Sequence, residues 1–583
     1  MVDSTRFLKI LNALYGESIA ADTMPRLSSL MDASRDTIPL PSSVDFEVTQ
    51  RDVMLITYGD QVRTKDAPPL RTLADFLGRQ LEGTIDCLHI LPFYPYSSDD
   101  GFSVIDFRQV SPDLGSWTDI DELSTKFRLM FDAVVNHVSA QSEWFRAFLR
   151  NEEPFREYFI EMQENPELSK VVRPRALPLL HRLGEPRHDK SVWTTFSADQ
   201  VDLNYHSPRV LLEVIDLLLY YVSKGAEFIR LDAIAYIWKE VGTSCIHLPQ
   251  THLIIQLFRA VLDEVAPQVK LITETNVPHK DNVSYFGDGY NEAQLVYNFA
   301  LPPLILHTFY TGNASELSRW AGDIKLPSDR VMFFNFLASH DGIGVNPVRG
   351  ILPDSAIDNM IERVIAHGGL VSYKHNPDGT TSPYELNINY FDALSNPNEN
   401  ETLDLQMDRF MAAQSIMLCL VGMAGIYFHS FFGSRSWKDG VLQTGQNRSI
   451  NRQKFSLEEL EHELGKENSL RSKVVKRYKE LIQARMASAA FHPHGIQEAL
   501  KLQDSLFALL RKSSQTNEQV LCLVNVTNQP QSIDVNLREI FESRIDVTSI
   551  SDLISGRLIE FQNKLSLNLS PYETSWLSLV SAQ

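Results

Sequence analysis

Charged side chains at the ends of apolar runs are the first sign of chemistry in this 583-residue sequence. In the segment GAEFIRLDAIAYIWK, residues 225–239, a single leucine separates Arg230 from Asp232. Residues two apart on a strand point the same way, so both charges share one face of an otherwise apolar segment. An unpaired charge is costly to bury, whereas a guanidinium beside a carboxylate keeps that carboxylate ionised. We therefore interpret the pair as a reactive carboxylate with its own counter-ion.

Other apolar runs end in polar groups of the same kind. RLMFDAVVNH carries Asp132, Asn136 and His137, KLITETN carries Glu274, and VMFFNFLASHD carries His340 and Asp341. Singly, each group has an ordinary structural explanation, such as a buried ion pair. Three carboxylates around one pocket suit glycosidic bond cleavage: one attacks the anomeric carbon, a protonated one donates to the leaving oxygen, and the third stabilises the oxocarbenium-like transition state. Glu274 lies in the more apolar run, where desolvation raises the pKa of an acid.

The elements that must position these groups alternate between strand-like and helical patterns. Eight short apolar runs predict strands: VMLITYG, DCLHILPF, RLMFDAVVNH, AEFIRLDAI, KLITETN, AQLVYNFAL, VMFFNFLASH and AGIYFHSFFG. Longer helical patterns such as PRVLLEVIDLLLYYVSK lie between them, which indicates a parallel sheet with helices outside it. Eight strands favour a closed (β/α)8 TIM barrel, an α/β fold, with an open doubly wound sheet as the alternative. In a barrel the polar groups would meet at the C-terminal face, where barrel active sites lie.

Interruptions in this alternation predict the domain organisation. Two irregular stretches follow strands, and the pattern after residue 488 alternates as in strands. We expect an N-terminal helical extension (1–50), barrel parts at 51–138, 206–341 and 401–488, an inserted B domain (139–205), a second inserted loop region (342–400) and a C-terminal β domain (489–583).

Composition excludes several classes of partner. Subtracting 74 acidic from 54 basic side chains gives a net charge of −20, which repels nucleic acids and anionic membranes. The four cysteines form no CxxC pair, so we expect no zinc site, no disulfide framework and a cytoplasmic location. We also expect no cofactor, because the sequence shows no dedicated carboxylate cage for calcium near Asn136. The first residues follow helical spacing rather than a signal-peptide pattern, and no apolar run is long enough to cross a bilayer. The sequence leaves the oligomeric state open, with a homodimer as one option.

Four segments together identify a family. DAVVNH, FIRLDAIAY, LITETN and LASHDG resemble, in order, the signature segments of the α-amylase superfamily, glycoside hydrolase family 13. The resemblance implies that Asp232 is the nucleophile, Glu274 the acid/base and Asp341 the transition-state stabiliser. It also implies that the sugar is bound by His137, Arg230, Tyr236 and His340.

Further segments resemble the sucrose phosphorylase branch of that superfamily. LITYGDQV, LHILPFYPYSSDDGFSVIDF, SHDGIGV and QNRSINR are similar to segments of those enzymes, and the likeness covers roughly residues 53–455. It implies that Asp99 and Arg448 hold glucosyl hydroxyls and that Phe102 and Phe196 form an apolar wall. Without the resemblance, the phenylalanines would be ordinary core residues and the charges ordinary loop charges.

The branch implies a double displacement with retention, in which inorganic phosphate takes the glucose as α-glucose 1-phosphate. Phosphate is an anion, so the site needs cations and must exclude water. Arg175 in the RPR segment matches an arginine on the acceptor side of the sucrose enzymes. Arg349, Lys374 and His375 are further candidates for acceptor and phosphate binding, each as readily explained as a surface charge.

The acceptor is expected to differ from fructose. Val172 stands where the sucrose enzymes have tyrosine, and the loop after HDGIGV is short and carries Arg349. The long N-terminal extension and NPVRGIL are most similar to the glucosylglycerate enzymes, and an arginine suits the carboxylate of D-glycerate. Phosphorylases of sucrose 6'-phosphate, glucosylglycerol or sucrose stay as alternatives, as does a retaining hydrolase or transglucosylase. A noncatalytic carbohydrate-binding relative is disfavoured because all three carboxylates are present.

Overall fold

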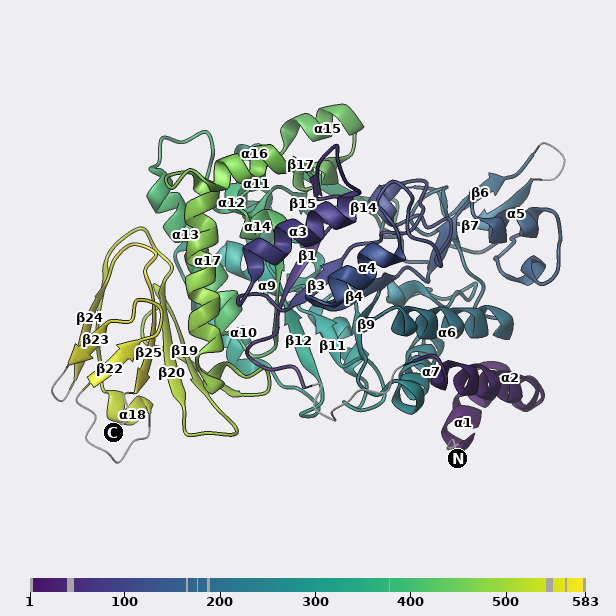
Figure 1. Ribbon diagram of the computed structural model, residues 1–583, viewed down its shortest axis with the longest axis horizontal. Coiled ribbons are helices and arrows are strands. Elements are labelled where there is room, and N and C mark those ends of the chain that lie inside the picture. The colour runs from purple at the N-terminus through teal and green to yellow at the C-terminus, as the bar shows by residue number, and fades with distance from the viewer. Residues whose placement is uncertain are drawn as a thin grey trace.

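A closed barrel of parallel strands forms the centre of the computed structural model, which describes residues 4–38, 47–163, 166–175, 177–185, 189–376, 378–541, 549–560 and 564–579 (Figure 1). Its strands are β1 (Val53–Thr57), β3 (Cys87–Ile90), β4 (Arg128–Ala133), β9 (Ala226–Leu231), β10 (Lys270–Thr273), β11 (Leu295–Tyr297), β12 (Met332–Asn335) and β16 (Met423–Tyr427). The order around the barrel is β1-β16-β12-β11-β10-β9-β4-β3. Because β1 pairs with both β3 and β16, the sheet has no free edge. The predicted (β/α)8 barrel is confirmed, and the open sheet is excluded.

Helices cover the outside of the barrel because its strands are apolar on both faces. All five residues of β1 are buried, as expected for a parallel strand between a packed interior and a helical layer. The covering helices include α3 (Pro69–Leu81), α4 (Trp117–Ser124), α6 (Pro208–Ser223), α7 (Pro249–Val265), α9 (Leu301–Thr311), α10 (Ser315–Asp323), α13 (Leu403–Cys419) and α17 (Leu470–Met486). The charged residues within the strands are therefore exceptions that need partners.

The N-terminal extension forms a helical hairpin on the barrel. Helices α1 (Ser4–Tyr15) and α2 (Glu17–Arg35) pack against α6 and α7, at the purple end of the chain in Figure 1. Gly16, with φ of +82°, makes the turn between them in a conformation that side chains disfavour. The Tyr15 hydroxyl donates to the carbonyl of Tyr205 at 2.9 Å, and Arg6 pairs with Asp263 at 3.0 Å. These contacts attach the extension to the helical layer.

Two inserts rise from the ends of barrel strands. Between β4 and β9 lie β5 (His137–Ser139), α5 (Glu143–Leu149), β6 (Leu180–Leu183), β7 (Lys190–Trp193) and β8 (Gln200–Asp202). Between β12 and β16 lie β13 (Ile343–Gly344), α11 (Asp354–Ala366), β14 (Leu370–His375), β15 (Thr381–Asn387) and α12 (Tyr390–Leu394). The second insert contains a three-stranded sheet of order β13-β15-β14, which the sequence pattern represented only as an irregular stretch.

The C-terminal part is all-β, as predicted. A six-stranded sheet contains β18 (Ile496–Leu500), β19 (Leu506–Lys512), β20 (Gln519–Asn525), β25 (Thr574–Leu579), β22 (Ser549–Asp552) and β23 (Leu558–Glu560), and β21 (Gln531–Val535) pairs with β24 (Leu565–Leu569). The buried guanidinium of Arg511 donates to the carbonyl of Cys419 at 2.6 Å, which fixes this sheet to α13. Among the described residues, no helix is long and apolar enough to cross a membrane.

Candidate active site

The register of two neighbouring strands creates the buried charge cluster. Asp132 of β4 lies directly opposite Arg230 of β9, and Asp232 follows Arg230 at the C-terminal end of β9. Arg230, with a side chain 2% exposed, donates hydrogen bonds to Asp132 and to Oδ1 of Asp232, the latter at 3.0 Å. The arginine is thus shared by two carboxylates, and this sharing compensates for the cost of burying it.

Glu274 lies at the end of β10 and faces Asp232 across the same arginine. A left-handed turn at Ala233, with φ of +48°, directs its N–H to Oε2 of Glu274 at 3.0 Å. Nη2 of Arg230 lies 4.0 Å from the same oxygen. Burial raises the pKa of both Asp232 and Glu274, and Arg230 opposes the rise in each. Two neighbouring carboxyl groups in this environment favour holding a proton between them.

The third carboxylate has a different electrostatic environment. Oδ1 of Asp341, just beyond β12, lies 2.6 Å from Nη1 of Arg448 and 3.8 Å from Nη2 of Arg452. Burial alone would raise the pKa of Asp341, but Arg448, then His340 and Arg452, hold it well below its usual range. Burial lowers the pKa of His340 to about 3, so its imidazole is neutral near pH 7. Asp341 therefore carries its charge when the first two carboxyl groups share a proton.

Aromatic and imidazole rings form a wall beside these charges. Phe102 stacks on His340, with ring centroids 4.7 Å apart and an interplanar angle of 6°. Phe196 packs against His137 at 5.3 Å and against Tyr236 at 5.5 Å. Nε2 of His137 lies 2.9 Å from the carbonyl oxygen of Phe102, and burial lowers the pKa of this histidine. The wall is built of packed rings, whose faces suit the face of a sugar ring.

One cavity contains most of the site residues suggested by the sequence. It is lined by Asp99, Phe102, His137, Arg175, Phe196, Asp232, Tyr236, Glu274, His340, Asp341 and Arg448. Arg230 contacts two of its carboxylates, Asp232 and Glu274. A second cavity of about 500 Å³ adjoins it and shares Asp99, Arg175 and Arg448. The arrangement matches the expected geometry of a pocket over the C-terminal ends of barrel strands.

Three suggested acceptor residues lie elsewhere in the structure. Arg349, Lys374 and His375 line neither cavity. Nη1 of Arg349 instead donates to Asp354 at 3.2 Å. Lys374 and His375 belong to β14, at the edge of the inserted sheet, and β15 separates them from β13.

The structure also adds residues that sequence reasoning missed. Gln200, Thr275, Asn276, Tyr384 and Glu385 line the inner cavity. Nη1 of Arg452 lies 3.1 Å from Asp100 and 3.5 Å from Asp99, and its Nε donates to the carbonyl of His340 at 2.9 Å. The segment QNRSINR contains both Arg448 and Arg452, so their four-residue spacing was a usable signal. Nothing local marked Tyr384 or Glu385.

A buried lysine lies behind His137. Nζ of Lys239, with a side chain 2% exposed, lies 2.6 Å from Oδ1 of Asn136 and 2.6 Å from Oδ2 of Asp202. The ammonium group of Lys239 thus supplies a positive charge beside Asn136 and Asp202. Within the described ranges, no group of three His, Cys, Asp or Glu side chains is arranged to hold a metal ion.

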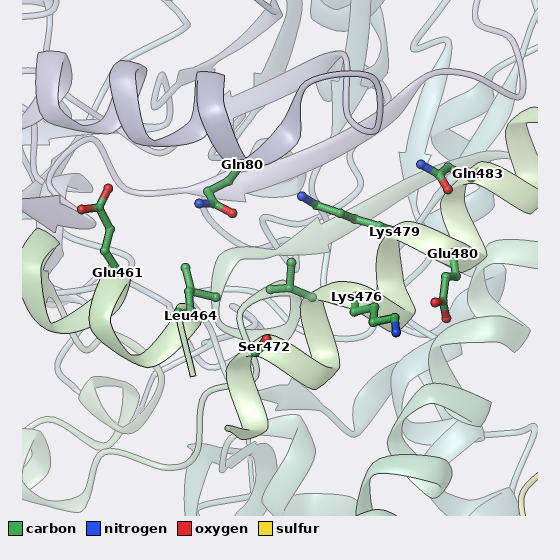
Figure 2. Close-up of a pocket in the computed structure, with 10 residues that line it drawn as sticks. Gln80, Glu461, Leu464, Ser472, Lys476, Lys479, Glu480 and Gln483 are labelled. Atoms are coloured by element: carbon green, nitrogen blue, oxygen red, sulfur yellow. The ribbon is translucent and has the colours of Figure 1, made fainter. Parts of the chain in front are cut away.

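A separate cavity of about 640 Å³ opens between α3, α16 (Leu457–Leu464) and α17 (Figure 2). Figure 2 shows Gln80 and Lys479 directed toward this space from opposite sides. Its only acidic lining residues are Glu461, which pairs with Arg79, and the exposed Glu480. It lacks the three convergent carboxylates that the glycoside chemistry expected from the sequence requires.

Comparisons with known proteins identify relatives of this chain. The α-amylase catalytic domain model matches residues 81–341. The chain is 50% identical over 581 residues to the glucosylglycerate phosphorylase of Spirochaeta thermophila, covering 98% of each chain. It is 31% identical to the sucrose phosphorylase of Agrobacterium vitis, covering 76% of this chain and 88% of that one.

A solved structure has the same fold. The crystal structure of sucrose 6F-phosphate phosphorylase from Thermoanaerobacter thermosaccharolyticum superposes with a TM-score of 0.71 at 24% identity. The match covers 83% of this chain and 96% of that chain.

Proposed function

The chain belongs to the α-amylase superfamily, in the group that contains the glucosylglycerate and sucrose phosphorylases, and from this premise we propose that it is a retaining phosphorylase of a glucosylglycerate. The observation that carries the proposal is the arrangement of Asp232, Glu274 and Asp341 around one cavity, with Arg230 bound to the first. The likeness to a glucosylglycerate phosphorylase over 98% of the chain supports glycerate as the acceptor.

In the first half of the proposed reaction, Asp232 attacks the anomeric carbon of the α-glucoside. The bond from that carbon to the leaving oxygen breaks, and Glu274 gives its proton to this oxygen. Arg230 lies 3.0 Å from Asp232 and 4.0 Å from Glu274, so its charge favours leaving the shared proton on Glu274. The products are a β-glucosyl ester of Asp232 and free glycerate.

In the second half, a phosphate oxygen attacks the anomeric carbon. The ester bond breaks, Asp232 recovers its carboxylate, and a phosphate O–H returns the proton to Glu274. Two inversions give α-glucose 1-phosphate. Forming the ester removes the charge of Asp232, but Glu274 has become a carboxylate by giving up its proton, so the net charge of the two groups is the same when the phosphate anion enters. The ionised Glu274 is then the base that takes the phosphate proton.

Arg175 is the cation best placed to meet an incoming anion. It lines both cavities, its side chain is 29% exposed, and Nη2 lies 3.9 Å from the nearest oxygen of Asp99. The other cavity arginines make closer carboxylate contacts. Glycerate and phosphate would bind here in turn, because each offers oxygens that match the guanidinium fork. Uncharged glycerol has no anionic oxygens and could not form this charge-assisted pair.

Phosphorolysis of glucosylglycerate tests the proposal directly. The purified protein is incubated with glucosylglycerate with and without inorganic phosphate, and glucose 1-phosphate and free glucose are measured separately. We expect α-glucose 1-phosphate, identified by the proton coupling of its anomeric signal in NMR, and little free glucose. Free glucose formed at an equal rate without phosphate would instead identify a hydrolase.

We propose that the protein acts on small molecules: the glucoside, phosphate and glucose 1-phosphate. We further propose a cytoplasmic location. All four cysteines are buried and unpaired, which suits a reducing compartment.

A further inference from the structure

A carboxylate from the second insert enters the active-site cavity. Glu385 of β15 lines the cavity, and its side chain is only 1% exposed. It accepts two hydrogen bonds from Arg448: one from Nε at 3.1 Å and one from Nη2. The third nitrogen of the same guanidinium, Nη1, lies 2.6 Å from Asp341. One arginine therefore bridges Glu385 and a carboxylate of the proposed reaction.

The backbone brings these residues together. Glu385 of β15 lies opposite Gly344 of β13. Gly344 follows Asp341 by three residues. At Gly342, a Cβ atom would lie 2.9 Å from the Cβ of Glu385, closer than such atoms normally approach. The chain after Asp341 thus runs directly against the strand that carries Glu385, and glycine is what permits this approach. Asp341, Arg448 and Glu385 form one packed unit.

We propose that Glu385 is a positioning residue for the proposed phosphorylase reaction, on which this inference rests: it holds Arg448 against Asp341. Paired Arg–carboxylate forks fix direction as well as distance. Arg448 also lines the outer cavity, so a guanidinium released from Glu385 would have room to shift while its charge stays near the site. The 2.6 Å contact would then no longer hold Asp341 in a fixed orientation toward the transition state.

Glu385 also sets the charge that Arg448 presents to the acid/base. Glu274 faces Arg230, Asp341 and Arg448, the N–H of Ala233, and the neighbouring carboxyl group of Asp232. Removing the negative charge of Glu385 makes this field more positive, which lowers the pKa of Glu274. The alkaline limb of activity, where Glu274 loses its proton, should therefore move to lower pH.

A second bidentate arginine–glutamate pair, Arg409 with Glu401, provides a matched control. Arg409 donates from Nη1 to Oε2 of Glu401 at 2.8 Å and from Nη2 to Oε1, with side chains 11% and 21% exposed. Its guanidinium lies over the ring of Tyr572, 4.7 Å from the centroid, beside the C-terminal sheet. Neither member lines the active-site cavity. A variant that breaks this pair loses the stability that a bidentate pair contributes, but it changes no contact in the proposed site.

The experiment compares Glu385→Gln with Glu401→Gln by melting temperature, by kcat and KM for phosphorolysis of glucosylglycerate, and by the pH profile of kcat/KM. We expect Glu385→Gln to lower kcat/KM about 10- to 100-fold, mainly through kcat. Its alkaline limb should fall by about 0.5 to 1 pH unit. Glu401→Gln should stay within about twofold of wild type with an unmoved limb. Equal kinetics for the two variants would overturn the role of Glu385.

A third variant keeps the test decisive if Glu385→Gln does not fold. Glu385→Asp retains the charge but shortens the reach, so we expect a reduced kcat with the wild-type pH limb. If Glu385→Asp keeps the wild-type kcat but its alkaline pH limb shifts, the result would contradict the positioning role of Glu385. A wild-type protein that forms no glucose 1-phosphate would contradict the proposed function itself, whereas an active wild type with an unchanged Glu385→Gln contradicts only this inference.

Discussion

The barrel strand ends and the inserted segments contribute charges to the same cavity in different ways. Arg230, on a barrel strand, is 2% exposed and binds two carboxylates. Arg175, on the first insert, is 29% exposed, and its nearest carboxylate oxygen is 3.9 Å away. In the proposed reaction, the donor end is thus organised before substrate arrives, whereas the proposed acceptor end keeps a cation available. Rigid strands would set the chemistry, and the inserts would set which anion takes part.

The largest loss of activity is expected on replacing Asp232, at the end of a barrel strand. Asp232→Asn removes the nucleophile while keeping the shape, and we expect kcat to fall by about 10⁴-fold or more because no glucosyl ester can form. Mass spectrometry after rapid quenching should show the covalent intermediate in wild type and none in the variant. Near-wild-type turnover in Asp232→Asn would refute this assignment.

Glu274 should give the next largest loss and a diagnostic pH dependence. Its pKa is raised, chiefly by burial, and the acid form is the one needed to protonate the leaving oxygen. Activity should therefore fall as pH rises through this raised pKa, whereas Asp341, with its lowered pKa, stays ionised across the neutral range.

Glu274→Gln should cost about 10²- to 10⁴-fold in kcat. The alkaline limb in the pH profile of kcat should also disappear in this variant. A limb that survives unchanged would assign the titration to another group.

Arg175 tests the acceptor side. Arg175→Ala should raise the KM for phosphate, and for glycerate in the reverse direction, by about 10- to 100-fold. The rate at which Asp232 is glucosylated should change much less, because Arg230 and the barrel carboxylates stay in place. Pre-steady-state bursts separate the two steps. Unchanged phosphate and glycerate affinities would remove Arg175 from the acceptor site.

The smallest effect is expected at Arg349. Its guanidinium pairs with the exposed Asp354 and lines neither cavity, so Arg349→Ala should alter KM for phosphate by less than about twofold. Steady-state titration of phosphate checks this. A change as large as that in Arg175→Ala would show that the second insert reorganises around the acceptor.

The sequence predicted the barrel and the location of its carboxylates for a physical reason. Buried parallel strands are continuous apolar runs, so charges at their ends, such as Asp232 and Glu274, stand out in a single sequence. Because barrel strands share one orientation, their C-terminal ends meet without any knowledge of long-range contacts.

The second insert could not be predicted in the same way. Its strands β14 and β15 are partly exposed and mostly polar, and they lack the apolar run that marks a barrel strand. The contact between Arg448 and Glu385 joins residues 63 positions apart, and it depends on β15 rather than β14 lying next to β13. Lys374 and His375 were plausible ligands by charge alone, but they belong to the outer strand of that sheet.

The most direct test of the central claim runs the reaction in reverse. α-Glucose 1-phosphate is incubated with the protein and, separately, D-glycerate, glycerol, fructose or fructose 6-phosphate, and phosphate release is followed above a control without acceptor. We expect release with D-glycerate well above that with the other acceptors and the control. Equal release without any acceptor would show that water is the true partner, and release with fructose or its phosphate alone would contradict the assignment of glycerate.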